Sequence, residues 1–181
     1  MHNAESIVNS IEEGLVKASA DNRAAFEANA AEFSAKLAEL DTWIRANVDT
    51  VPAAERLLVS NHDALGYYTA AYGITYVGAV IPSFDDNAEP SAAEIDKLVA
   101  AITETGVRAV FSEASLNPKA AQAIADEAGV RVYSGPDALY VDSLGPAGSD
   151  GDTYIGAQVH NVTRVFESWG IAPSDVPAGL E

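Results

Sequence analysis

Three ionisable side chains could form a metal site, because each follows a short apolar run typical of a buried strand. His62 follows the first such run, Glu113 follows the third, and Asp142 lies in the loop after the fourth. In an open parallel sheet, ligands bind beyond the carboxyl ends of the strands. One imidazole and two carboxylates can hold a divalent cation without any thiolate. A structural, hydrogen-bonded His62 fits the same spacing, so both roles stay open at this point.

The composition narrows the chemistry further. The chain of 181 residues has no cysteine, which excludes disulfides, thiolate metal sites and cysteine nucleophiles. Its 27 acidic and 10 basic residues give a net charge of −17, which argues against nucleic acid and anionic membranes as partners. The nucleophile pattern G-x-S-x-G is incomplete around Ser149, because Ala147 replaces the first glycine. A hydrolase would therefore lack a nucleophile, and we predict that the chain is not an enzyme.

The elements that must position these residues alternate between apolar runs and amphipathic stretches. Strands are predicted at Leu57–Val59, Ile74–Val80, Val107–Phe111 and Val130–Tyr133. Helices are predicted at Ala64–Tyr72, after a capping box at Ser91–Glu94, at Asn117–Ala128 and at Thr153–Trp169. The uncharged run Ala64–Phe84 is long enough for a membrane span, but Gly73 divides it into a helix and a strand. The alternation predicts an α/β fold, a four-stranded parallel sheet with helices on both faces.

Two further helices are predicted before this alternation. Ala4–Ser19 and Asn22–Val48 both carry apolar residues every three or four positions, and Val51–Pro52 ends the second helix. At about 1.5 Å per residue, the second helix would be roughly 40 Å long, which exceeds what one small lobe requires. It is typical of a strut that links two lobes. The first residues lack the basic and then apolar pattern of a signal peptide, so no targeting segment is predicted.

Ordered motifs show a resemblance that covers nearly the whole chain. The run Arg56–Gly73, RLLVSNHDALGYYTAAYG, resembles a signature of the metal-binding ABC-transporter substrate-binding proteins, the zinc- and manganese-binding lipoproteins and adhesins of bacteria. Further matches follow in order at Glu89–Ser91, Val110–Glu113, Val141–Gly145, Thr153–Gly156 and His160–Val162. Residues 22–41 are similar to the helix that joins the two lobes of that family.

The resemblance implies a site shared between two lobes. Members of the family hold one divalent cation between two α/β lobes, and each lobe supplies two ligands. Carried over residue by residue, the ligands of the second lobe are His62 and Asp142, and Glu113 supports the site by hydrogen bonding. His160 matches a structural position on the closing helix, and no ligand role is carried over to His2.

The resemblance also implies a domain organisation with one lobe missing. Residues 1–20 would be a remnant of the first lobe, residues 21–51 the long linking helix, and residues 52–181 the C-terminal α/β lobe. Two ligands are half of the four that a zinc site usually has, so weak or absent metal binding is expected of this chain alone. The apolar sides of the two N-terminal helices favour a homodimer.

The implied function is that of an extracytoplasmic solute-binding protein, periplasmic or lipid-anchored. In the intact two-lobe protein it would capture Zn²⁺ or Mn²⁺ for an ABC permease. The imidazole of His62 favours zinc, because manganese prefers oxygen ligands. The alternative is an adhesion or protein-interaction module whose acidic surface binds a partner and whose metal is incidental.

Overall fold

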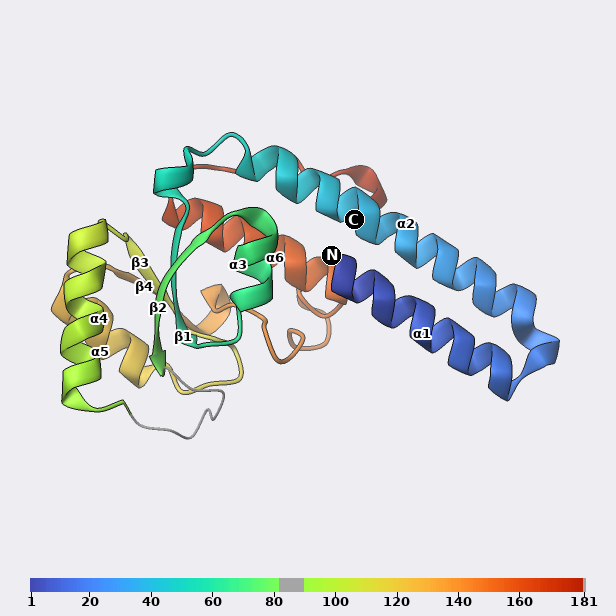
Figure 1. Ribbon diagram of the computed structural model, residues 1–181, viewed down its shortest axis with the longest axis horizontal. Helices are drawn as coiled ribbons and strands as arrows, with labels where there is room; N and C mark the ends of the chain where they lie inside the picture. Colours follow the sequence, from blue (N-terminus) through green and yellow to red (C-terminus); the bar gives the residue numbers. More distant parts are fainter. Residues whose placement is uncertain (82–89, 181) are drawn as a thin grey trace. The chain divides into compact units, whose positions relative to one another are not determined.

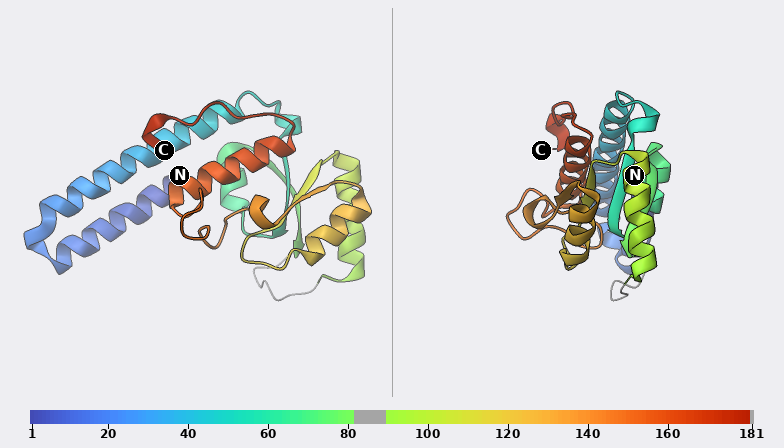
Figure 2. Two further views of the ribbon diagram at one scale, coloured as in Figure 1. Left: turned by 180° about the vertical axis from the view of Figure 1, so that it is seen from behind. Right: turned by 90° about the vertical axis from the view of Figure 1, so that its left-hand side faces the viewer.

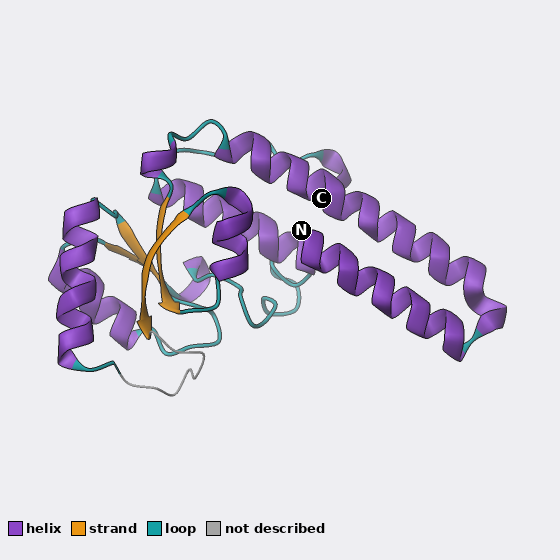
Figure 3. Cartoon of the chain, in the orientation of Figure 1, coloured by secondary structure: helices purple, strands orange, loops and turns teal. Residues whose placement is uncertain are grey.

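The computed structural model describes residues 1–81 and 90–180, which form two compact units. One unit contains Met1–Asn47 and the C-terminal segment from Asp175, and the other contains Val48–Ser174. Figure 3 shows that the strands all belong to the second unit. Glu89 of the Glu89–Ser91 motif lies outside the described residues.

The first unit is a pair of helices. Helix α1 spans His2–Ala18, a 3₁₀ turn follows, and helix α2 spans Arg23–Val48 with 26 residues. Both predicted helices are thereby confirmed, and Gly14 does not interrupt α1. The indole nitrogen of Trp43 donates a hydrogen bond to the carbonyl oxygen of Asp175 at 3.1 Å, which attaches the C-terminal segment to α2.

The second unit is an α/β lobe with a four-stranded parallel sheet in the order β2-β1-β3-β4. The strands are β1 Leu57–His62, β2 Thr75–Ile81, β3 Ala109–Phe111 and β4 Arg131–Tyr133. The helices are α3 Gly66–Tyr72, α4 Ala92–Thr105, α5 Lys119–Ala128 and α6 Tyr154–Ser168. Figures 1 and 2 show α4 and α5 on one face of the sheet and α3 and α6 on the other. The predicted fold is confirmed.

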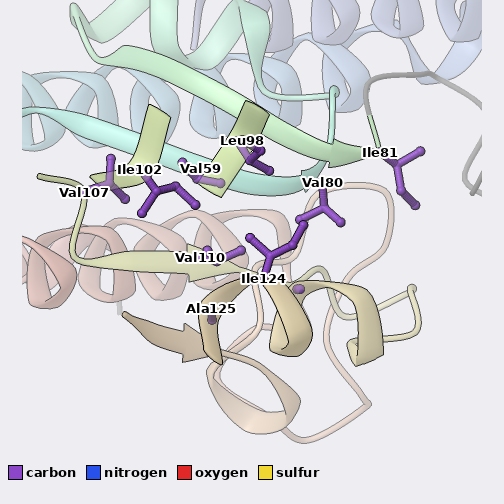
Figure 4. Packing of buried hydrophobic residues seen from close by; sticks show 10 residues of the cluster. Val59, Val80, Ile81, Leu98, Ile102, Val107, Val110, Ile124 and Ala125 are labelled. Atoms are coloured by element: carbon purple, nitrogen blue, oxygen red, sulfur yellow. The ribbon is translucent and has the colours of Figure 1, made fainter. Parts of the chain in front are cut away.

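A cluster of buried aliphatic side chains fills the space between the sheet and the α4/α5 layer (Figure 4). Val59 of β1 and Val110 of β3 meet Ile102 of α4 and Ile124 of α5 there, and each is at most 1% exposed. Side chains alternate between the two faces of a strand. His62 and Glu113 each follow one of these valines by three positions, an odd number. Both therefore face away from this cluster, toward the α3/α6 side.

The local signals that end and start helices act as predicted. Helix α3 ends at Gly73, whose φ of 61° is the left-handed conformation that glycine adopts without strain. Ser91 and Glu94 form the predicted capping box at the start of α4. The uncharged run after His62 is thus divided between α3 and β2. Along the described part of the chain, no helix combines the length and apolar character that a membrane crossing requires.

Candidate metal centre

The candidate site lies where the chain leaves the sheet in two opposite directions. From β1 the chain continues through α3 to β2 at one edge, and from β3 it continues through α5 to β4 at the other. Strands β1 and β3 are neighbours, so the connections that follow them diverge beyond their carboxyl ends, the place where open α/β sheets bind ligands. The register pairs Ser60 with Phe111, which places His62 and Glu113, each two residues further, side by side. His62 is the last residue of β1, whereas the sequence analysis predicted a strand that ends three residues earlier, at Val59.

A short buried hydrogen bond joins His62 to Glu113. The Oε1 atom of Glu113 lies 2.6 Å from Nδ1 of His62, and it also accepts the backbone N–H of His62 at 3.2 Å. The two residues are only 4% and 1% exposed. An ionised carboxylate can only accept hydrogen bonds, so beside an ionised Glu113 the Nδ1 atom carries a hydrogen, and Nε2 is the ring nitrogen that faces Asp142. The contact with Glu113 thus occupies Nδ1 and leaves Nε2 as the ring nitrogen on the side of Asp142.

The electrostatic state of Glu113 depends on its burial. Burial raises the pKa of its carboxyl group, whereas the neighbouring His62 opposes that rise. Its second oxygen, Oε2, is buried and has no hydrogen-bond partner within the described residues. A negative charge here is costly unless a positive charge comes close to it.

Asp142 completes the cluster. Its Oδ2 atom lies 3.2 Å from Nε2 of His62, and its side chain is 52% exposed. Ligand atoms of His62, Glu113 and Asp142 all lie within 4.8 Å of one another. The three residues singled out in the sequence are therefore brought together at one edge of the sheet, with His62 between the two carboxylates.

Asp142 reaches this place because the chain after β4 returns to the sheet. The backbone N–H of Leu139 donates to the carbonyl oxygen of Ser112 at 3.0 Å, and the N–H of Ala114 donates to the carbonyl oxygen of Leu139 at 2.9 Å. This isolated parallel bridge pairs Glu113 with Leu139. The bridge thus places Leu139, three residues before Asp142, beside Glu113.

Two hydroxyl groups support the backbone of His62, and the sequence analysis did not identify them. The Oγ atom of Ser60 donates to the carbonyl oxygen of His62 at 2.7 Å and lies 2.7 Å from the hydroxyl oxygen of Tyr76. Burial raises the pKa of Tyr76, so its hydroxyl group stays neutral and can donate. The signal available in the sequence was Ser60 directly after the apolar run Leu57–Val59. In the structure Ser60 is fully buried, and buried hydroxyl groups need hydrogen-bond partners.

The other two histidines lie outside this cluster. Nε2 of His160 lies 2.9 Å from the carbonyl oxygen of Ala138, and its ring packs against Tyr140 with centroids 4.7 Å apart. Burial lowers the pKa of His160, so its ring is neutral and Nε2–H donates. His2 is exposed on α1, where it lies 3.7 Å from Glu5.

Comparison with known proteins identifies relatives over nearly the whole chain. Residues 1–167 match the family described as ZnuA, zinc-uptake complex component A, periplasmic. The manganese-binding lipoprotein MntA of Bacillus subtilis is 32% identical over 164 residues, which are 89% of this chain and 53% of MntA. The zinc-binding protein TroA of Treponema pallidum is 32% identical over 136 residues, which are 74% of this chain and 43% of TroA.

A solved structure agrees with the fold. The periplasmic zinc-binding protein TroA from Treponema pallidum superposes with a TM-score of 0.82 at 27% identity, over 89% of this chain and 58% of TroA. The chain spans about half the length of the curated relatives it matches. These relatives are named as metal-binding lipoproteins or periplasmic proteins, and none of them is named as an enzyme. Since the family match covers 167 of the 181 residues, this chain belongs to the ZnuA/TroA family of metal-binding ABC-transporter substrate-binding proteins.

Proposed function

We propose that this chain is the C-terminal lobe, with its linking helix, of an extracytoplasmic receptor that captures a divalent transition metal and delivers it to an ABC permease. His62 and Asp142 supply two of the metal ligands, and Glu113 orients His62. The lobe itself is residues 52–181. Residues 21–51 form the helix that links it to a first lobe, and residues 1–20 belong to that first lobe. No bond chemistry is involved, because the metal ion is the cargo.

One distance carries the proposal. Two ligand atoms at about 2.1 Å from a tetrahedral zinc ion are separated by roughly 3.4 Å. Nε2 of His62 and Oδ2 of Asp142 are 3.2 Å apart, so an ion can bind between them after a shift of a few tenths of an ångström. The exposed side of Asp142 leaves room for the remaining ligands to approach. The hydrogen bond from Nδ1 to Glu113 is the usual second interaction of a metal-binding histidine.

The ligand types favour zinc over manganese. An imidazole ligand suits zinc, whereas manganese prefers sites composed of oxygen atoms. Two protein ligands are half of a tetrahedral shell, so this chain alone should bind zinc weakly. Relatives with the same family signature are named for manganese as well as zinc, which makes the comparison of the two ions part of the test.

The test is a calorimetric titration of the full chain with Zn²⁺ and, separately, with Mn²⁺. His62→Ala and Asp142→Ala should each abolish the weak zinc signal. The matched controls are His2→Ala and Asp96→Asn, which remove an exposed histidine and an exposed acid from α1 and α4. Equal zinc binding by the wild type and the Asp142→Ala variant would disprove the proposed site, and submicromolar zinc affinity would disprove the half-shell argument.

We also propose a homodimer through the N-terminal helices. Ile7, Ile11 and Leu15 follow one another at four-residue intervals on α1 and are 59%, 56% and 43% exposed. Such a stripe is typical of a surface that a partner covers. Light scattering should give the mass of a dimer, and Ile11→Glu should reduce it to that of a monomer. A monomeric wild type at high concentration would contradict the homodimer.

A further inference from the structure

The segment that leads to Asp142 is held along both of its edges. In an extended chain, the backbone groups of successive residues point in opposite directions. Leu139 uses one edge, where it pairs with Ser112 and Ala114 in the continuation of β3. Ala138 and Tyr140 present their polar groups to the other edge, where α6 takes the place of a neighbouring strand.

Asn161 of α6 makes both hydrogen bonds that a strand residue would make to Tyr140. Its Oδ1 atom accepts the N–H of Tyr140 at 2.8 Å, and its Nδ2 atom donates to the carbonyl oxygen of Tyr140 at 2.7 Å. The adjacent His160 donates to the carbonyl oxygen of Ala138 at 2.9 Å. Asn161 is 7% exposed, so the amide is committed to this contact. We name the three hydrogen bonds from His160 and Asn161 to Ala138 and Tyr140 the α6 clamp.

We infer that Asn161 is a positioning residue of the metal site, which presets the place of Asp142 without touching the ion. The inference rests on the proposed ligand role of Asp142. Beyond Tyr140 the chain enters a stretch rich in Gly, Pro and Ser, whose backbone hydrogen bonds within the described residues begin only at Gly145, after Asp142. The α6 clamp is the last fixed point on the α6 side before Asp142, two residues later. Loss of the clamp would let Asp142 sample positions farther than 3.2 Å from Nε2 of His62, and each such position is unproductive for binding.

Asn161→Asp tests the inference with almost no change of shape. The carboxylate still accepts from the N–H of Tyr140 but opposes its carbonyl oxygen with a second acceptor. Asn161→Leu removes both bonds. The matched control is Val162→Ala on the same helix, because Val162 is fully buried and makes no hydrogen bond to residues 138–142 through its side chain. This control lowers the stability of the lobe while leaving the clamp in place.

Two measurements on the full chain decide the outcome. Zinc titration should show a dissociation constant raised on the order of tenfold in both Asn161 variants and unchanged in Val162→Ala. Backbone NMR order parameters should fall over residues 140–145 in the Asn161 variants alone. Zinc binding that depends on Asp142 but not on Asn161 would overturn this inference and leave the proposed function intact. Zinc binding that Asp142→Ala leaves unchanged would overturn both. If Val162→Ala raised the zinc dissociation constant as much as Asn161→Asp does, the effect of Asn161 would come from lobe stability and the inference would be wrong.

Discussion

Replacing Glu113 by glutamine separates the charge of this side chain from its shape. The Oε1 atom accepts hydrogen bonds from Nδ1 and from the backbone N–H of His62 at 2.6 and 3.2 Å. An amide oxygen can accept both bonds, but it lacks the negative charge that makes Nε2 a better electron donor. Outer partners of this kind change metal affinity by about 10- to 100-fold, which corresponds to about 1.4–2.7 kcal/mol. We expect the zinc dissociation constant of Glu113→Gln to rise by that factor.

The same substitution should weaken zinc binding but stabilise the metal-free fold relative to the wild type, and this stabilisation should grow as the pH rises. Because burial raises the pKa of Glu113, the folded protein keeps this proton at pH values where the unfolded chain, with a pKa of about 4.3, has lost it. The free energy of unfolding of the wild type therefore falls as the pH rises from about 4.3 to the raised pKa, by at most about 1.4 kcal/mol per pH unit. Glutamine does not titrate, so the variant gains stability relative to the wild type over this window.

Zinc competition titration and urea unfolding at several pH values measure the two effects separately. Glu113→Ala serves as the control, because it leaves Nδ1 of His62 buried without an acceptor and should lower both affinity and stability. An unchanged dissociation constant in Glu113→Gln would refute the argument that the carboxylate prepares His62. Complete loss of binding in Glu113→Gln would place Glu113 among the ligands instead. A stability difference that does not grow with pH would show that the charge of Glu113 is already compensated in the fold.

Three further substitutions test the physical account of the fold by urea unfolding. Burial lowers the pKa of His160, so below about pH 6.5 the unfolded chain takes up a proton that the folded chain does not. The free energy of unfolding therefore decreases as the pH decreases. His160→Gln keeps a donor for Ala138 and should lose less stability between about pH 7 and 5; an equal loss would contradict this assignment. Gly106→Ala should destabilise by about 1–2 kcal/mol, since φ is 76° and a Cβ would meet no atom, so only backbone strain acts. Gly14→Ala, in the middle of α1 and equally free of contacts, should stabilise by about 0.5–1 kcal/mol, and the same sign for both glycines would count against this reasoning.

The sequence predicts the elements of this fold well because each carries a local signal. The capping box at Ser91, the glycine at the end of α3 and the apolar runs of the strands need no knowledge of the rest of the chain. The meeting of His62 and Glu113 also follows from a general rule, because parallel strands direct their carboxyl ends to one edge. Their roles as ligand and supporting residue come from the family resemblance and stay predictions.

The path of Asp142 is different, because backbone hydrogen bonds determine it. The sequence indicates only a loop after the fourth strand, whereas the structure pairs Leu139 with Glu113 and binds Tyr140 to Asn161. The pairing of Leu139 with Glu113 uses backbone groups that every residue type except proline has, so no side chain in the sequence indicates it. The second contact does leave a trace, since Asn161 is a polar residue on the buried side of α6.

The acidic composition and the candidate site are separate properties of the molecule. Among the acidic residues that the structure describes, only Glu113 and Asp142 join this cluster. When both are ionised, these two carboxylates together carry the charge that one divalent cation neutralises. Asp142 is half exposed and keeps much of its hydration, whereas Glu113 is buried with one oxygen unpartnered, so the cation gains most by offsetting the charge of Glu113. The imidazole of His62 lies between the two, so under the proposed ligand roles the buried carboxylate would act on the ion through His62 and not by direct contact.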